Sequence, residues 1–78
     1  MMGKVMAEFK YEIVEKVGVI SQGAKGWSKE LNFISWNERE PKFDIREWSE
    51  DHSQMSKGVS LTKAELIALR DLLNSIKL

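Results

Sequence analysis

Hydrophobic and polar residues alternate along several stretches of the chain with a period of two, which is the period of a β-strand. The first stretch covers residues 8–21 and is long enough to need a bend, which Gly18 would permit. One face of this strand carries Phe9, Tyr11, Ile13, Val17 and Val19, and the other carries Lys10, Val14 and Lys16. The pattern therefore predicts an N-terminal strand with one mostly apolar face.

A second strand is expected from Trp27 to about Trp36, after a turn that contains two glycines. A polar turn closed by Pro41 then leads into the decapeptide 42–51. Alternation places Phe43 and Ile45 on a core face of this third strand. The other face carries Lys42, Asp44, Arg46 and Trp48. Cations that follow phosphates beside a ring that stacks on a base suit single-stranded nucleic acid, although an ordinary amphipathic strand gives the same pattern.

The last third of the chain changes to a helical period. A short strand over residues 57–61 precedes the sequence Thr62-Lys-Ala-Glu65, which is a capping box for a helix from about Lys63 to Ile76. Apolar positions on this helix form a stripe broader than one packing surface needs, and they include Leu66, Ile67, Leu69, Leu72, Leu73 and Ile76. Either the helix lies deep in its own sheet, or it covers the sheet and also meets a second protomer. Four strands followed by one helix predict an α+β fold.

Composition narrows the possible functions. The 78 residues suit one small domain over residues 1–78, near the size at which a single core is marginal. The absence of cysteine excludes disulfides and thiolate metal sites, and the single histidine, His52, is expected on the surface. Oligomerisation is then the expected source of additional buried area. We expect a cytoplasmic protein, because the sequence has neither a membrane-spanning apolar run nor the apolar core of a signal peptide.

Twelve basic and twelve acidic residues give a net charge of zero, so bulk charge alone does not attract nucleic acid. Local grouping is more informative, because cations and tryptophans collect on the strand face that is expected to lie away from the helix or beside its turns. The candidate DNA-binding residues are Lys16, Lys25, Trp27, Lys29, Trp36, Lys42, Arg46, Trp48 and Lys57. Alternatively, Trp36 and Trp48 fill a second small core that forms on dimerisation.

No arrangement typical of catalysis is present in the sequence. It has no Ser/His/Asp or Cys/His set and no phosphate-cradling glycine loop. Glu47, Glu50 and Asp51 have the chemistry to bind Mg²⁺, but such runs are usually solvated loop charge. We therefore expect a protein that is not an enzyme, with no cofactor, no bound metal and no small-molecule substrate.

Two segments resemble the transcriptional positive cofactor 4 family, in its compact bacterial form without a serine-rich arm. These are Asp-Ile-Arg-Glu-Trp at residues 44–48 and Lys-Gly-Val-Ser-Leu at residues 57–61, within a resemblance that covers roughly residues 19–77. The resemblance implies a strongly bent, four-stranded antiparallel sheet, and a homodimer formed through the helices. It further implies binding of single-stranded or melted DNA with little sequence preference, in transcription regulation, replication or repair.

The resemblance also assigns expected roles to individual residues. Arg46 and Trp48 match a basic residue and an aromatic beside the DNA channel, Trp36 lies near an aromatic that packs on bases, and Lys57 matches a lysine before the last strand. The expected dimer interface comprises Leu66, Leu69, Leu72, Leu73 and Ile76. A departure from the family is Ser49, where members often have a second aromatic. Single-stranded RNA binding and a protein-interaction module that uses the helix stripe are the alternatives.

Overall fold

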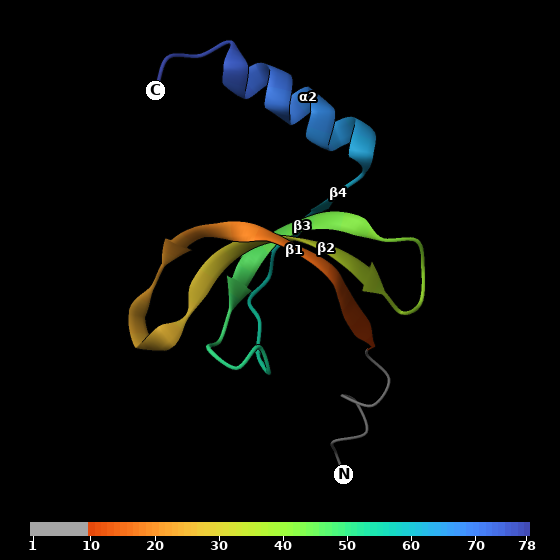
Figure 1. Ribbon diagram of the computed structural model, residues 1–78, viewed down its shortest axis with the longest axis vertical. Coiled ribbons are helices and arrows are strands. Elements are labelled where there is room, and N and C mark those ends of the chain that lie inside the picture. The colour runs from red at the N-terminus through yellow and green to blue at the C-terminus, as the bar shows by residue number, and fades with distance from the viewer. Residues whose placement is uncertain (1–9) are drawn as a thin grey trace.

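The computed structural model describes residues 10–78 as an open four-stranded antiparallel sheet followed by one helix (Figure 1). The elements are β1 (Tyr11–Gln22), the short 3-10 turn η1 (Ala24–Gly26), β2 (Ser28–Trp36), β3 (Lys42–Trp48), β4 (Val59–Leu61) and α2 (Lys63–Asn74). The strands lie in sequence order, β1-β2-β3-β4. This confirms the predicted α+β class and order of elements. Residues 8 and 9 of the predicted first strand, which include Phe9, lie outside the described residues.

The β2–β3 connection is a tight hairpin whose backbone suits its residues. Asn37 and Glu38 have φ values of 52° and 64°, as expected for the left-handed central residues of a type I′ turn. The Arg39 N–H donates to the Trp36 carbonyl at 2.9 Å and closes the turn. Asparagine adopts this conformation more readily than most residues. Its Oδ1 accepts from the Lys10 N–H at 3.1 Å and so ties the turn to the start of β1.

Strand β1 bends the sheet into an arch. Its pairing with β2 shifts register three times, between Ile13 and Glu15, between Lys16 and Gly18, and between Val19 and Ser21. Each such irregularity bends a strand and increases its twist. Figure 1 shows the result, with α2 beyond the convex side of the sheet and the segment between β3 and β4 under the concave side.

The bend also changes which side chains of β1 share a face. Cross-strand pairing places Lys16 opposite Asn32 and Tyr11 opposite Trp36, and these β2 residues lie on the concave side. Tyr11 and Lys16 are therefore on the same face, which corrects the alternation predicted from sequence. The physical reason is that an extra residue at a bulge moves all following side chains to the other face.

Helix α2 begins where the capping box predicts. The Glu65 N–H donates to the Thr62 hydroxyl oxygen at 3.1 Å, and the Thr62 N–H donates to the Glu65 carboxylate at 2.8 Å. The helix ends at Asn74, two residues before the predicted end. None of its residues is buried, which excludes the alternative in which the helix lies deep in its own sheet.

The buried residues of the described chain lie under the arch. Ile34 and Trp48 are fully buried there together with the polar Asn32 and Asp44, which are 1% and 0% exposed. Phe43, which was predicted to face the core, lies on the convex side and is only partly buried. The two faces of β3 are grouped as predicted, but the face predicted to be open is the more deeply buried one.

Candidate nucleic-acid interface

A polar row crosses all four strands on the concave side. The registers align Lys16 of β1 with Asn32 of β2, Asp44 of β3 and Ser60 of β4. Side chains at paired positions of an antiparallel sheet lie on the same face. Asn32 and Asp44, in the middle of this row, are buried, so their polar groups depend on partners within the protein.

Trp48 lies at the centre of an aromatic cluster. Its ring centroid is 5.4 Å from that of Tyr11 and 5.4 Å from that of His52, and Tyr11 also lies 5.7 Å from Trp36. Trp48 pairs with Ser28 at the start of β2, and Trp36 is the last residue of β2. These two ends would be about 26 Å apart on a flat strand. Tyr11 contacts both rings because the arch brings these ends together.

This geometry does not support the predicted stacking of Trp48 on bases. The side chain is 0% exposed, so no base can reach its ring faces. Trp48 instead belongs to a second core, as the alternative interpretation of the tryptophans held, but this core forms within one chain.

Arg46 is also committed to internal contacts. Its Nε and Nη2 donate to the two carboxylate oxygens of Asp44 at 2.6 and 2.7 Å, and the Ser60 hydroxyl donates to the same carboxylate at 2.8 Å. Its Nη1 donates to the Ser56 carbonyl and the Met55 sulfur at 3.4 Å. This geometry does not support the phosphate contact predicted for Arg46, because the Asp44 carboxylate already neutralises the guanidinium.

The Arg46 guanidinium in turn holds a tryptophan. Its central carbon lies 4.6 Å from the centre of the Trp36 ring, within cation–π range. Gly58 packs against the same arginine, where a Cβ would collide with the Arg46 Cβ and the Ile45 carbonyl. Trp36 remains partly exposed while the Arg46 guanidinium holds its ring in place, and a residue that stacks on a base needs both features.

A second buried ionic group lies beside this cluster. The Glu30 carboxylate accepts the Ser28 hydroxyl at 2.6 Å and the Asn32 amide at 3.1 Å, and the His52 Nε2 lies 3.0 Å from both of its oxygens. Burial alone would raise the pKa of Glu30, but these hydrogen bonds and the His52 charge lower it below its ordinary 4.5. His52 is thus partly buried and paired, in contrast to the predicted surface position.

The loop after β3 is held by its own polar groups. Asp51 Oδ1 accepts from the Ser53 hydroxyl at 2.7 Å, from the Ser53 N–H at 3.0 Å and from the Ser49 hydroxyl at 3.0 Å. These bonds lower the pKa of Asp51, and the bond from the Ser53 hydroxyl has the largest effect. The Tyr11 hydroxyl donates to the His52 carbonyl at 2.9 Å and ties the loop to β1. Among residues 10–78, no group of three or more acidic or histidine side chains could hold a metal ion.

The lysines differ in their positions. The register puts Lys16 and Lys42 on the concave side, one on each side of β2, and both are exposed. Lys29 pairs with Glu47 on the convex face, away from the other candidate lysines of the strands. Lys57 and Lys25 are exposed in connecting segments, and Trp27 is partly buried next to η1. Of the nine predicted residues, the structure therefore leaves Lys16, Lys42 and Trp36 available to a ligand on the concave side.

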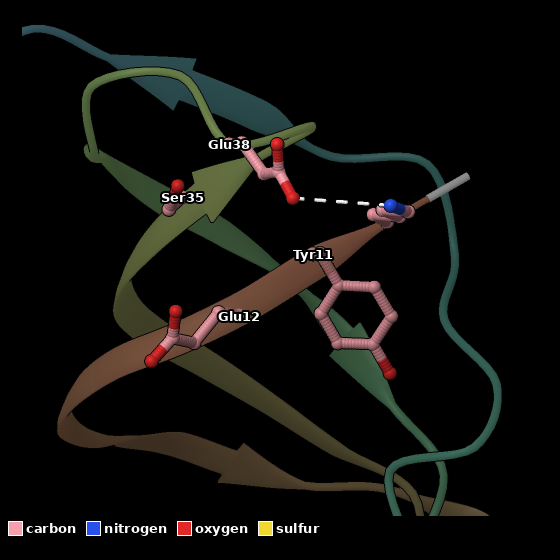
Figure 2. Close-up of a pocket in the computed structure, with 5 residues that line it drawn as sticks. Tyr11, Glu12, Ser35 and Glu38 are labelled. Atoms are coloured by element: carbon pink, nitrogen blue, oxygen red, sulfur yellow. Dashed lines mark ion pairs between the residues drawn. The ribbon is translucent and has the colours of Figure 1, made fainter. Parts of the chain in front are cut away.

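A cleft of about 400 Å³ opens where β1 begins (Figure 2). Tyr11, Glu12, Ser35 and Glu38 line it with Lys10, whose Nζ lies 3.8 Å from Glu38 Oε2. Two carboxylates outnumber the single ammonium, so this cleft does not favour a phosphate.

Sequence reasoning missed the buried polar residues Glu30, Asn32 and Asp44. Each alternates with apolar residues, which is also the pattern of a solvent-facing side chain. One pattern in the sequence could have indicated them: a single strand face carries serine, glutamate and asparagine at positions 28, 30 and 32. Burial of that face depends on the arch and on the loop beneath it.

Comparison with known proteins bears on the same region. A family model described as Transcriptional Coactivator p15 (PC4) matches residues 23–72. An uncharacterized protein from Treponema pallidum (strain Nichols) is 55% identical to this chain over 76 residues, or 97% of this chain and 89% of that protein. The match to the family model begins just before η1 and includes all of β2, β3 and β4, so it contains the Asp44–Arg46 pair, Trp36 and Lys42.

Proposed function

The chain belongs to the transcriptional coactivator p15 (PC4) family, and on this premise we propose that it binds single-stranded DNA as a non-enzymatic homodimer. Family membership supports a general DNA-binding or transcription-related role. The finer proposal is that the protein acts on DNA opened during transcription, replication or repair, in the cytoplasm and without a cofactor. Most of its affinity is proposed to be independent of base sequence.

One observation carries the proposal: exposed lysines flank the partly exposed Trp36 on the concave side of the sheet. Lys16 and Lys42 lie on either side of β2, and Trp36 is fixed by the Arg46 guanidinium. Ammonium groups neutralise phosphates, and an aromatic side chain held in place stacks with any base. Duplex DNA offers phosphates but no unstacked base, so this arrangement favours a single strand.

The apolar convex side supports the proposed dimer. A groove of about 470 Å³ between α2 and the sheet is lined by apolar side chains that include Leu66, Leu69 and Leu73. Leu73 is 47% exposed and Leu72 65% exposed in the described chain. An apolar surface of this kind is unusual on a monomer and is typical of an interface. Among residues 10–78, no helix is long and apolar enough to cross a membrane.

A fluorescence titration tests the nucleic-acid proposal. Oligo-dT, duplex DNA of equal length and oligo-U are added at two salt concentrations. We expect oligo-dT to quench tryptophan emission in the wild type and in Trp48→Phe, and to quench Trp36→Phe much less. Quenching by duplex alone, or by none of the three, would refute the proposal. Stronger quenching by oligo-U would favour RNA as the ligand.

Sedimentation equilibrium tests the dimer. Leu69→Asp should shift the protein toward the monomer, because it places a charge in the groove, whereas Lys63→Glu on the exposed first turn should not. A wild-type protein that is monomeric at micromolar concentration would contradict the dimer and favour the helix stripe as a surface for another protein.

A further inference from the structure

A cavity of about 430 Å³ opens on the concave side, between the β1–β2 hairpin and the loop after β3. Lys16 and Asn32 line it from the sheet, and Glu50 and His52 line it from the loop, with Glu30 between them. Its volume is in the range of small-ligand sites and is large enough for one nucleobase. Lys16 belongs both to this cavity and to the lysines proposed to contact phosphates.

Two side chains of this cavity, Glu30 and Glu50, offer only hydrogen-bond acceptors, and Asn32 adds an acceptor that no protein group uses. The Glu30 carboxylate already accepts from Ser28 and Asn32, and His52 adjoins both of its oxygens. The Asn32 side chain donates its Nδ2 to Glu30, which fixes the orientation of the amide. Its Oδ1 is buried without a hydrogen-bond partner, and the residue is 1% exposed. A buried acceptor without a donor is costly, so a ligand that supplies a donor, directly or through one water molecule, is favoured.

The charges of the cavity select which part of a nucleotide fits. Apart from His52, the cavity has one cation, Lys16, and two carboxylates, Glu30 and Glu50. This balance disfavours a second phosphate inside the cavity but leaves Lys16 available for the phosphate at its edge. Acceptors pair with the exocyclic amino groups of cytosine, adenine and guanine. Thymine and uracil offer only the ring N3–H, which lies between two carbonyl groups that a nearby acceptor repels.

We propose that this cavity receives one nucleobase of the bound strand and that Asn32 selects a base with an exocyclic amino group over thymine or uracil. The proposal rests on the single-strand binding proposed above and adds one selective position to an otherwise sequence-tolerant surface. Lys16 holds the adjoining phosphate, and Glu30 positions the Asn32 amide.

Three labelled oligonucleotides of about 12 nucleotides, a length within the usual site sizes, test the proposal by fluorescence anisotropy. The first is all dT, the second has one central dC, and the third has N4,N4-dimethyl-dC at that position. We expect the dC strand to bind about tenfold more tightly than all dT, as one good base contact allows. The dimethyl strand should bind like dT, because it keeps the ring and loses the donor. Equal binding of the dC and dT strands would overturn the proposal and leave single-strand binding intact, whereas failure of all three strands would refute the proposed function.

Two variants separate base selection from general single-strand binding. Asn32→Leu removes the acceptor at similar volume and should abolish the preference for dC while affinity for dT stays close to that of the wild type. Lys16→Ala should weaken binding of both strands equally and retain the preference. Circular dichroism checks that each variant folds, and the dimethyl-dC strand tests the contact in the wild type if Asn32→Leu does not fold. A preference for dC that survives in a folded Asn32→Leu protein would rule out Asn32 as its origin.

Discussion

Asp44→Asn is the substitution that most directly tests the buried charge pair between Asp44 and Arg46. Asp44 is 0% exposed and accepts three short hydrogen bonds, two from Arg46 and one from Ser60. Asparagine has nearly the same volume, so the change removes charge without opening a cavity. It leaves the Arg46 guanidinium, whose side chain is 14% exposed, without a counter-charge.

The expected loss is large relative to the stability of so small a domain. Removing one partner of a buried ion pair typically costs about 3–5 kcal/mol. A chain of this length has a free energy of unfolding of roughly 4–12 kcal/mol at 0.05–0.15 kcal/mol per residue. With a urea m-value near ~1 kcal/mol/M, the unfolding midpoint should fall by about 3 M or more. The variant is therefore best measured in a buffer that contains a stabilising osmolyte.

Urea unfolding followed by circular dichroism and tryptophan fluorescence, at one protomer concentration, measures the effect. The matched control is the double variant Asp44→Leu with Arg46→Met, which replaces both charges by apolar groups of similar volume. It should recover most of the lost stability, because no unpaired charge remains. An exposed ion pair contributes below about 1 kcal/mol. A loss of stability that small for Asp44→Asn would refute the conclusion that the pair acts as a buried one.

Three further predictions follow from other contacts. Glu30 has a lowered pKa in the folded protein, so its contribution to stability is complete above about pH 4.5 and is lost as pH falls through the lower folded pKa. Thermal unfolding from pH 6 to pH 3 should show this loss of stability, and the loss should be smaller in Glu30→Gln. Gly58→Ala should destabilise the protein by about 1–3 kcal/mol through overpacking against Arg46, whereas Ala substitution at Gly18, which has open space around it, should not cause a collision; urea midpoints compare the two. Lys42→Ala should lower the salt dependence of oligo-dT affinity by about one unit of slope, and Lys29→Ala on the opposite face should leave it unchanged; equal effects would contradict the assignment of faces.

Local chemistry made parts of this fold predictable. The capping box at Thr62 places the start of α2 because its two hydrogen bonds join residues only three positions apart. The alternation of β3 likewise separates Phe43 and Ile45 from Asp44 and Trp48, because successive side chains of a strand point to opposite faces. These features need no information from distant residues.

The order of strands and helix, the composition of each face of β3, and the lysines and tryptophans available for binding can thus all be read from the amino-acid pattern. The tertiary structure decided which face is buried. Three register shifts in β1 bend the sheet, and the loop that carries His52 closes the concave side, so Trp48 becomes a core residue and Arg46 a partner of Asp44. A side chain's periodicity is fixed by its own strand, but its exposure depends on the curvature of the whole sheet and on the segments that pack against it.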